Sequence, residues 1–227
     1  DDRLRAHIEG LWHTGHIYLE RPRVVDEVEN GLFYFREAFY PLAPQVLTQL
    51  YRTLTEAFPS ERFDIPAVLQ FSSWRGGDRD GNPFVTAEVT RQTLRRHAQL
   101  ILELYQEDVR GLIQRLSHSV RETAVSEELR QSIQEDAAAI PAAAALMARN
   151  PHEPYRVKCA LMRQRLLARA EAIGRGQSPE AWPPHAYRHA ADVLADVTLM
   201  RRSLEEHGGA RAAETWLRPL EFRIKTF

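Results

Sequence analysis

The residues best suited to chemistry stand together between Phe71 and Gln92, in the stretch FSSWRGGDRDGNPFVTAEVTRQ. Two adjacent glycines permit backbone conformations and close approaches that side chains would block. Arg75 and Arg79 offer charge-assisted hydrogen bonds to a phosphate or a carboxylate. The stretch lies between a predicted strand and a predicted helix, so its N–H groups could face an anion at the helix N-terminus. This composition is typical of an anion-binding turn.

The same residues also fit a turn with a purely structural role. In this second interpretation Asp78 and Asp80 pair with arginines and cap the following helix. Two more specific interpretations fail. A calcium loop needs glycine at its sixth position and glutamate at its twelfth, whereas this stretch has glycine at the fourth and Val89 at the twelfth. A P-loop requires Gly-Lys followed by Ser or Thr. Anion binding and a structural turn both stay open.

The bulk composition excludes several classes of protein. The 227 residues are 44% hydrophobic, enough for one large domain or two small ones. The net charge of −1 provides no basic field for nucleic acid, and no apolar run is long enough for a membrane span. The single cysteine, Cys159, fits a reducing cytoplasm. Its helical spacing with Tyr155 and Met162 predicts a buried structural thiol.

Apolar residues three or four positions apart predict that most of the chain is helical. Pro41 and Pro44 should kink or divide the second helix, and Pro141 should disturb the fourth. Thr86 offers a side-chain cap for the third. The expected helices cover about residues 3–20, 25–58, 86–116, 126–147, 155–173, 185–207 and 211–222.

The best strand candidate is AVLQFSSW at residues 67–74. The expected fold class is therefore mainly α, with long helices around at most one or two short strands. We expect a single mainly helical domain over residues 1–227. It contains a strand plus the GGDRDGNP loop at 66–86 and a flexible Gly- and Pro-rich linker at 174–184. The chain starts without methionine and stops in mid-pattern, which indicates a piece of a longer protein.

The segment SSWRGGDRDGNPFVT resembles the signature of the phosphoenolpyruvate carboxylase family. In that signature, serine and tryptophan are followed by a variable apolar residue, GGDRDGNP, any residue, and Val-Thr. Upstream, LWHTGHIYLERPRVVDEVENGLFYF is similar to the family's helices with LWxT, RPxxxDE and a later YF. Downstream, VSEELRQSIQEDA, RNPHEPYRVKCALMRQRL and LMRRSLEEHGG follow in the family's order. The resemblance covers essentially the whole chain.

This resemblance implies an enzyme that carboxylates phosphoenolpyruvate with bicarbonate, using Mg²⁺ or Mn²⁺, to give oxaloacetate and phosphate. It also implies a cytoplasmic homotetramer built on a helix-rich α/β barrel. The family's Thr-Ala-His-Pro-Thr segment with the catalytic histidine, its Gly-Arg-Gly-Gly segment and its metal-binding carboxylates do not match this sequence. We therefore expect an internal fragment without its own catalytic or metal-binding residues. It should be inactive without the remainder of the same polypeptide.

Carried over residue by residue, the resemblance places the motif residues in the substrate pocket or in the layer that supports it. Trp74 would line the pocket near the methylene group of phosphoenolpyruvate. Arg79 would either orient an oxyanion or be held by Asp78 and Asp80 as a strut. The glycines would let the loop approach the substrate, and Asn82 and Pro83 would shape the entry into the next helix. The matching residues are Trp74, Gly76, Gly77, Asp78, Arg79, Asp80, Gly81, Asn82 and Pro83.

Arg75 departs from the family, which usually has an apolar residue such as methionine at this position. Its guanidinium either adds charge at the pocket or points away and pairs with an aspartate. The alternative function for the whole chain is a non-catalytic helical scaffold or regulatory module whose loop binds an anionic effector.

Overall fold

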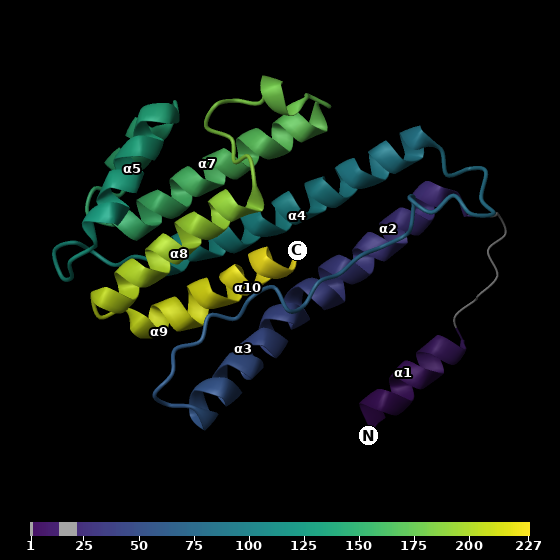
Figure 1. The fold of residues 1–227 in the computed structure, drawn as a ribbon, viewed down its shortest axis with the longest axis horizontal. Coiled ribbons are helices and arrows are strands. Elements are labelled where there is room, and N and C mark those ends of the chain that lie inside the picture. The colour runs from purple at the N-terminus through teal and green to yellow at the C-terminus, as the bar shows by residue number, and fades with distance from the viewer. Residues whose placement is uncertain (1, 14–21) are drawn as a thin grey trace.

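The computed structural model describes residues 2–13 and 22–227, and these residues are mostly helical without any β-strand, which confirms the mainly α fold class (Figure 1). The helices are α1 (Asp2–Trp12), α2 (Val24–Tyr34), α3 (Tyr40–Ala57), α4 (Ala87–Arg115), α5 (Glu127–Ala139), α6 (Ala143–Arg149), α7 (Pro154–Gly174), α8 (Ala190–Glu206), α9 (Ala210–Ala212) and α10 (Arg218–Thr226). Two π-helical turns, Phe35–Phe39 and Ala213–Leu217, and a 3₁₀ turn, Pro179–Ala181, join some of them.

The two longest helices, α4 and α7, pack against each other along the middle of the molecule (Figure 1). Residues 157–162 of α7 are all buried, which is more than one full helical turn. This part of the helix is therefore surrounded on every side, unlike a surface helix with a single apolar stripe. Cys159 lies in this buried turn, as predicted, and burial raises the pKa of its thiol to about 12.

A cluster of four charges crosses the interior beside α7. The Lys158 side chain is fully buried, and its Nζ lies 2.6 Å from Asp136 Oδ2 on α5 and 2.7 Å from Asp196 Oδ1 on α8. It also donates to Ser132 Oγ at 2.7 Å. Arg165 Nη1 contacts the same two carboxylates at 2.9 and 3.1 Å. The cluster contains two cations and two anions, so each buried charge of α7 is paired with carboxylates of α5 and α8.

The prolines predicted that the helix expected at 25–58 is kinked or divided. In the structure the π-helical turn Phe35–Phe39, just before Pro41, separates α2 from α3. Pro44 has no N–H to donate to the carbonyl of Tyr40 four residues earlier. Arg223 of α10 donates to this carbonyl instead, with its Nε 3.4 Å from Tyr40 O. Its Nη1 pairs with Asp108 Oδ1 of α4 at 2.6 Å, and the Tyr40 hydroxyl donates to Asp108 Oδ2 at 2.6 Å. These contacts connect the start of α3 to α4 and α10.

The strand expected at residues 67–74 does not form. This segment is extended and runs back alongside α3 and α2 (Figure 1), but it takes part in no β-ladder among the described residues. Aromatic contacts hold it in place: the Phe71 ring stacks on Phe39 with centroids 4.9 Å apart and on Phe227 at 5.2 Å. A β-strand needs a neighbouring strand with which its backbone forms hydrogen bonds. This segment is held instead by the side chain of Phe71.

Helix α8 begins at Ala190, five residues later than expected at 185. Arginines of α7 donate hydrogen bonds to carbonyl oxygens that would accept from backbone amides if the helix began at residue 185. Arg165 Nε donates to His185 O at 3.2 Å, and Arg169 Nη1 donates to Tyr187 O at 2.7 Å and also to Arg188 O. Asp192 then caps the helix by accepting from the amide nitrogen of His189 at 2.8 Å.

The remaining predicted elements agree closely with the structure. Pro141 separates α5 from α6, and the last helix continues to Thr226 instead of ending near residue 222. The predicted linker at 174–184 contains the 3₁₀ turn and Trp182, whose ring lies 4.3 Å from the Arg169 guanidinium carbon. Its flexibility stays a prediction. The single-domain organisation also stays a prediction, because the end of the expected 3–20 helix lies outside the described residues and α1 buries none of its side chains.

Replacing Lys158 by methionine should lower the free energy of unfolding of the chain by about 3–5 kcal/mol, because the buried Asp136 and Asp196 lose a cation. Lys225 is a matched control, since it is the other of only two lysines and pairs with Asp64, which is exposed. Lys225→Met should cost about 1 kcal/mol or less. Urea unfolding followed by circular dichroism measures both values. Equal losses would contradict a special role for the buried cluster.

Candidate functional site

The candidate site is the signature loop, defined here as residues 74–84, which connects the extended segment to α4. Its first turn is closed by the amide nitrogens of Gly77 and Asp78, which lie 2.9 and 3.0 Å from Trp74 O. Gly76 has a φ of +74°, in the left-handed region that favours glycine. A Cβ on Gly76 would also lie 2.1 Å from Thr93 Oγ1 of α4. The turn therefore packs against α4 at a distance that only glycine allows.

The acidic and amide side chains of the loop stabilise the loop itself. Asp78 Oδ1 accepts from the amide nitrogen of Asp80 at 3.0 Å, and Asn82 Oδ1 accepts from that of Phe84 at 3.1 Å. The cap of α4 is Thr86, as predicted, with its Oγ1 3.3 Å from Val89 N. Asn82 is half-buried and Pro83 beside it is exposed, and their shaping of the entry into this helix stays a prediction.

The described residues show no ion pair of the kind expected in a purely structural loop. Neither Asp78 nor Asp80 pairs with an arginine among the described residues, and neither aspartate caps α4. Arg79 is exposed and makes no ion pair within the same part of the chain. Of the two roles expected for Arg79, the strut held by Asp78 and Asp80 has no ion pair among the described residues, and the role at an oxyanion stays a prediction.

The loop presents an apolar surface and a cation to the outside. The Trp74 side chain is 79% exposed and that of Phe84 63% exposed. Arg79 lies between them in sequence with its guanidinium free of ion pairs to described residues. Gly77 and Gly81 are also exposed, and a Cβ on Gly81 would meet open space. An exposed indole and a guanidinium without an ion pair on the same loop could bind a ligand that combines an apolar part with an anionic group.

Helix α2 also contacts the loop. Residues 22–27 lie next to the loop, and a hollow of about 360 Å³ is lined by Pro22, Arg23, Val24, Val25, Glu27, Asn82, Phe84 and Val89. Arg75 points away from the exposed face and donates from Nη1 to Glu27 O at 2.7 Å. Arg96 of α4 pairs with Glu29 of α2 through contacts of 2.6 and 3.0 Å. Arg75 thus binds a main-chain carbonyl of α2 and not an aspartate.

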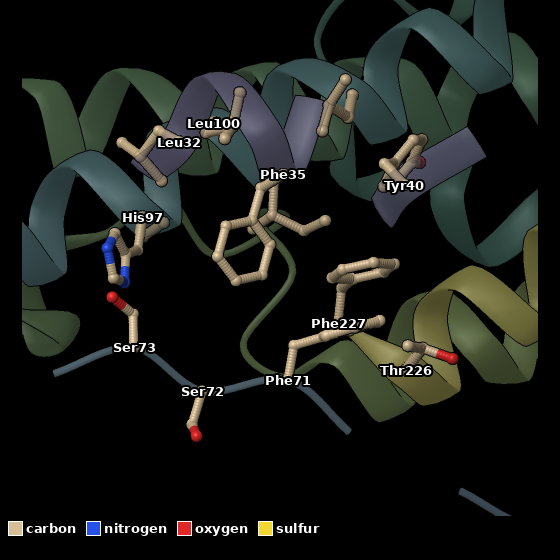
Figure 2. A pocket seen from close by; sticks show the side chains of 13 residues that line it. Leu32, Phe35, Tyr40, Phe71, Ser72, Ser73, His97, Leu100, Thr226 and Phe227 are labelled. Carbon is tan, nitrogen blue, oxygen red and sulfur yellow. The ribbon is translucent and has the colours of Figure 1, made fainter. Parts of the chain in front are cut away.

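An apolar pocket that sequence reasoning missed lies directly before the loop (Figure 2). It has a volume of about 300 Å³, and Figure 2 shows Phe35, Phe71 and Phe227 gathered on one side with Ser73 near His97 on another. Burial lowers the pKa of His97, because the pocket disfavours its charged form. His97 stands one helical turn before Ile101 in the apolar stripe of α4, which was the available signal in the sequence.

The described residues hold no group of three or more His, Cys, Asp or Glu side chains arranged to bind a metal ion. In the same part of the chain, every helix is too short or too polar to cross a lipid bilayer.

Comparisons with known proteins agree with the signature. A family model described as "Phosphoenolpyruvate carboxylase" matches residues 1–227. A protein named phosphoenolpyruvate carboxylase from Roseiflexus castenholzii is 38% identical over 233 residues, covering 99% of this chain and 24% of the relative. Relatives of the same name from Methylorubrum extorquens and Shewanella loihica are 34% and 35% identical, and the alignments cover 100% and 99% of this chain. The chain spans about a quarter of the length of these relatives.

Gly76→Ala and Gly81→Ala form a matched pair that tests the packing of the loop on α4. Both glycines have positive φ, so alanine at either position should cost about 1–2 kcal/mol of backbone strain. Only the methyl group at position 76 collides with Thr93. We expect Gly76→Ala to speed amide hydrogen exchange across residues 74–84 and in the first turn of α4, and Gly81→Ala to affect only its own turn. Indistinguishable exchange patterns would contradict this packing.

Proposed function

The chain belongs to the phosphoenolpyruvate carboxylase family, and from this premise we propose that its signature loop forms one wall of the substrate pocket in the complete carboxylase. The observation that carries the proposal is the outward presentation of Trp74 and Arg79 on a loop whose backbone is held by α2 and α4. Fixed backbone with free functional groups is the arrangement that positions a ligand without reorganising the protein.

The reaction that we propose for the complete enzyme converts phosphoenolpyruvate and bicarbonate to oxaloacetate and phosphate, which places it among the carbon–carbon lyases. Bicarbonate oxygen attacks the phosphorus, the bond from phosphorus to the enol oxygen breaks, and carboxyphosphate and the enolate result. Carboxyphosphate then breaks between its carboxyl carbon and the phosphate oxygen to give CO₂ and phosphate, and the enolate carbon attacks this CO₂ to form oxaloacetate. Phosphoryl transfer needs cationic donors around the transferring group, and the enolate needs a site from which water is excluded.

The two exposed side chains match these requirements. The Arg79 guanidinium would contact the phosphate or the developing oxyanion with directed N–H groups. The Trp74 indole would cover the methylene carbon of phosphoenolpyruvate and keep water from the enolate. Asp78 and Asn82, which bond to loop amides, would hold the turn in shape while substrate binds. None of these groups transfers a proton, so the loop would orient the substrate and leave proton transfer to other residues.

The other parts of the site belong to the remainder of the polypeptide in this proposal. The divalent metal would supply positive charge at the reacting oxygens, but the described residues do not fit a metal site. The catalytic histidine segment and the Gly-Arg-Gly-Gly segment of the family do not match this sequence. We also propose a cytoplasmic homotetramer for the complete enzyme; the cytoplasmic location is supported by the lone, free thiol of Cys159.

Arg79→Ala in the complete enzyme should reduce kcat/KM for phosphoenolpyruvate by about 100-fold or more, because a directed donor to the transferring group is lost. Its thermal midpoint should stay unchanged, since Arg79 makes no ion pair with the described residues. Arg91→Ala is the matched control, because Arg91 is exposed on α4 and pairs only locally with Glu88. Steady-state kinetics decides the outcome. Unchanged kcat and KM in Arg79→Ala would contradict a role at the pocket and favour the regulatory alternative.

The 227-residue chain alone should release no phosphate from phosphoenolpyruvate in a bicarbonate-dependent way, because one wall of a pocket cannot supply the donors and the metal. A coupled assay of the purified chain, with the complete enzyme as positive control, measures this. Bicarbonate-dependent turnover by the chain would overturn the division of the site that we propose.

A further inference from the structure

The side chain of Arg75 has a place in the structure that its neighbours in the motif do not share. It is half-buried between exposed Trp74 and buried Gly76, and it extends toward α2 instead of toward the outer face of the loop. Its Nη1 lies 2.7 Å from the carbonyl oxygen of Glu27, 48 residues earlier in the chain. The guanidinium donates to an oxygen that also lies within the hydrogen-bonded backbone of α2.

The surface of α2 has room for this side chain because residue 31 is glycine. A Cβ on Gly31 would lie 3.2 Å from Arg75 Cδ and 3.4 Å from its Nη1. Glycine inside a helix costs about 1 kcal/mol relative to alanine, so its presence in the middle of α2 calls for a local reason. The arginine that lies against it supplies one.

Arg75 is also part of the turn that sets the direction of Trp74. The amide nitrogens of Gly77 and Asp78 both donate to Trp74 O, so residues 75 and 76 are the two central residues of this turn. Gly76 is held against Thr93 of α4, and Arg75 is held on α2. The Arg96–Glu29 pair fixes α2 and α4 to each other beside these contacts. The turn is therefore attached to two helices that are themselves connected.

We propose that Arg75 is a positioning residue that holds the signature loop on α2 and so sets the orientation of Trp74 toward phosphoenolpyruvate. The proposal rests on the proposed function only for its effect on substrate binding. Its structural half, the attachment of the loop through Arg75, is independent of what the loop binds. A methionine at this position could cover Gly31 but could not donate to the Glu27 carbonyl.

The test compares Arg75→Met, Arg75→Lys and the control Arg91→Met in the complete enzyme. Arg91 is again suitable because its ion pair with Glu88 stays within one turn of α4. Without substrate, Arg75→Met should speed amide hydrogen exchange at Gly77 and Asp78 by about tenfold, the factor given by 1.4 kcal/mol of lost bonding. In kinetics it should raise KM for phosphoenolpyruvate by a similar factor and leave kcat within about twofold. Arg75→Lys, which keeps one donor, should give intermediate values, and Arg91→Met should match the unmodified enzyme.

The exchange and kinetic measurements separate the two proposals. Unchanged exchange at Gly77 and Asp78 in Arg75→Met overturns the inference, even if the thermal midpoint falls. Faster exchange with unchanged KM also overturns it, because the attachment would then have no consequence for binding. Failure of the proposed function shows instead in Arg79→Ala, whose kinetics would be normal whatever the exchange data for Arg75→Met.

Discussion

The buried ammonium group of Lys158, between the carboxylates of Asp136 and Asp196, is the interaction on which the helical arrangement depends. It joins α5, α7 and α8 at a point where α7 is covered on all sides. An unpaired charge at this depth would be far too costly to keep, so the three helices must meet in this one arrangement. Helix α4 packs along α7, and the signature loop packs on α4 through Gly76 and Thr93. The signature loop is therefore connected to the core through α4 and α7.

Arginine side chains complete the backbone where the helices leave carbonyl oxygens without their usual donors. Arg223 takes the oxygen of Tyr40 that Pro44 cannot use, and Arg156 donates to Ile113 O near the end of α4 at 2.8 Å. Arg165 and Arg169 do the same for the segment before α8. A planar guanidinium can donate to a carbonyl and a carboxylate together, which suits a fold without a β-ladder in its described residues. Arg75 in the signature loop likewise donates from its guanidinium to a backbone carbonyl, that of Glu27.

Much of this arrangement could be predicted from the sequence, because it follows from local patterns. The periodicity of apolar residues located α4 and α7 to within two residues, and Thr86 was identified as a cap from its type and place. The late start of α8 could not be predicted, since arginines from a different helix determine it. The strand prediction at 67–74 failed for a similar reason: residue preferences indicate an extended chain, but a ladder requires a partner that a single segment does not reveal. The motif likewise identified the loop, whereas the direction of Arg75 depends on its contact with the Glu27 carbonyl of α2, which is distant in sequence.

The central claim is that the exposed indole of Trp74 meets phosphoenolpyruvate in the complete enzyme. Hydroxyl-radical oxidation of Trp74, quantified by peptide mass spectrometry with and without phosphoenolpyruvate, tests it most directly. Trp182 serves as the internal reference, because it packs beneath Arg169 away from the signature loop. The account predicts that phosphoenolpyruvate slows the oxidation of Trp74 and leaves that of Trp182 unchanged. Equal oxidation rates for Trp74 in the two conditions, under saturating substrate, would contradict it.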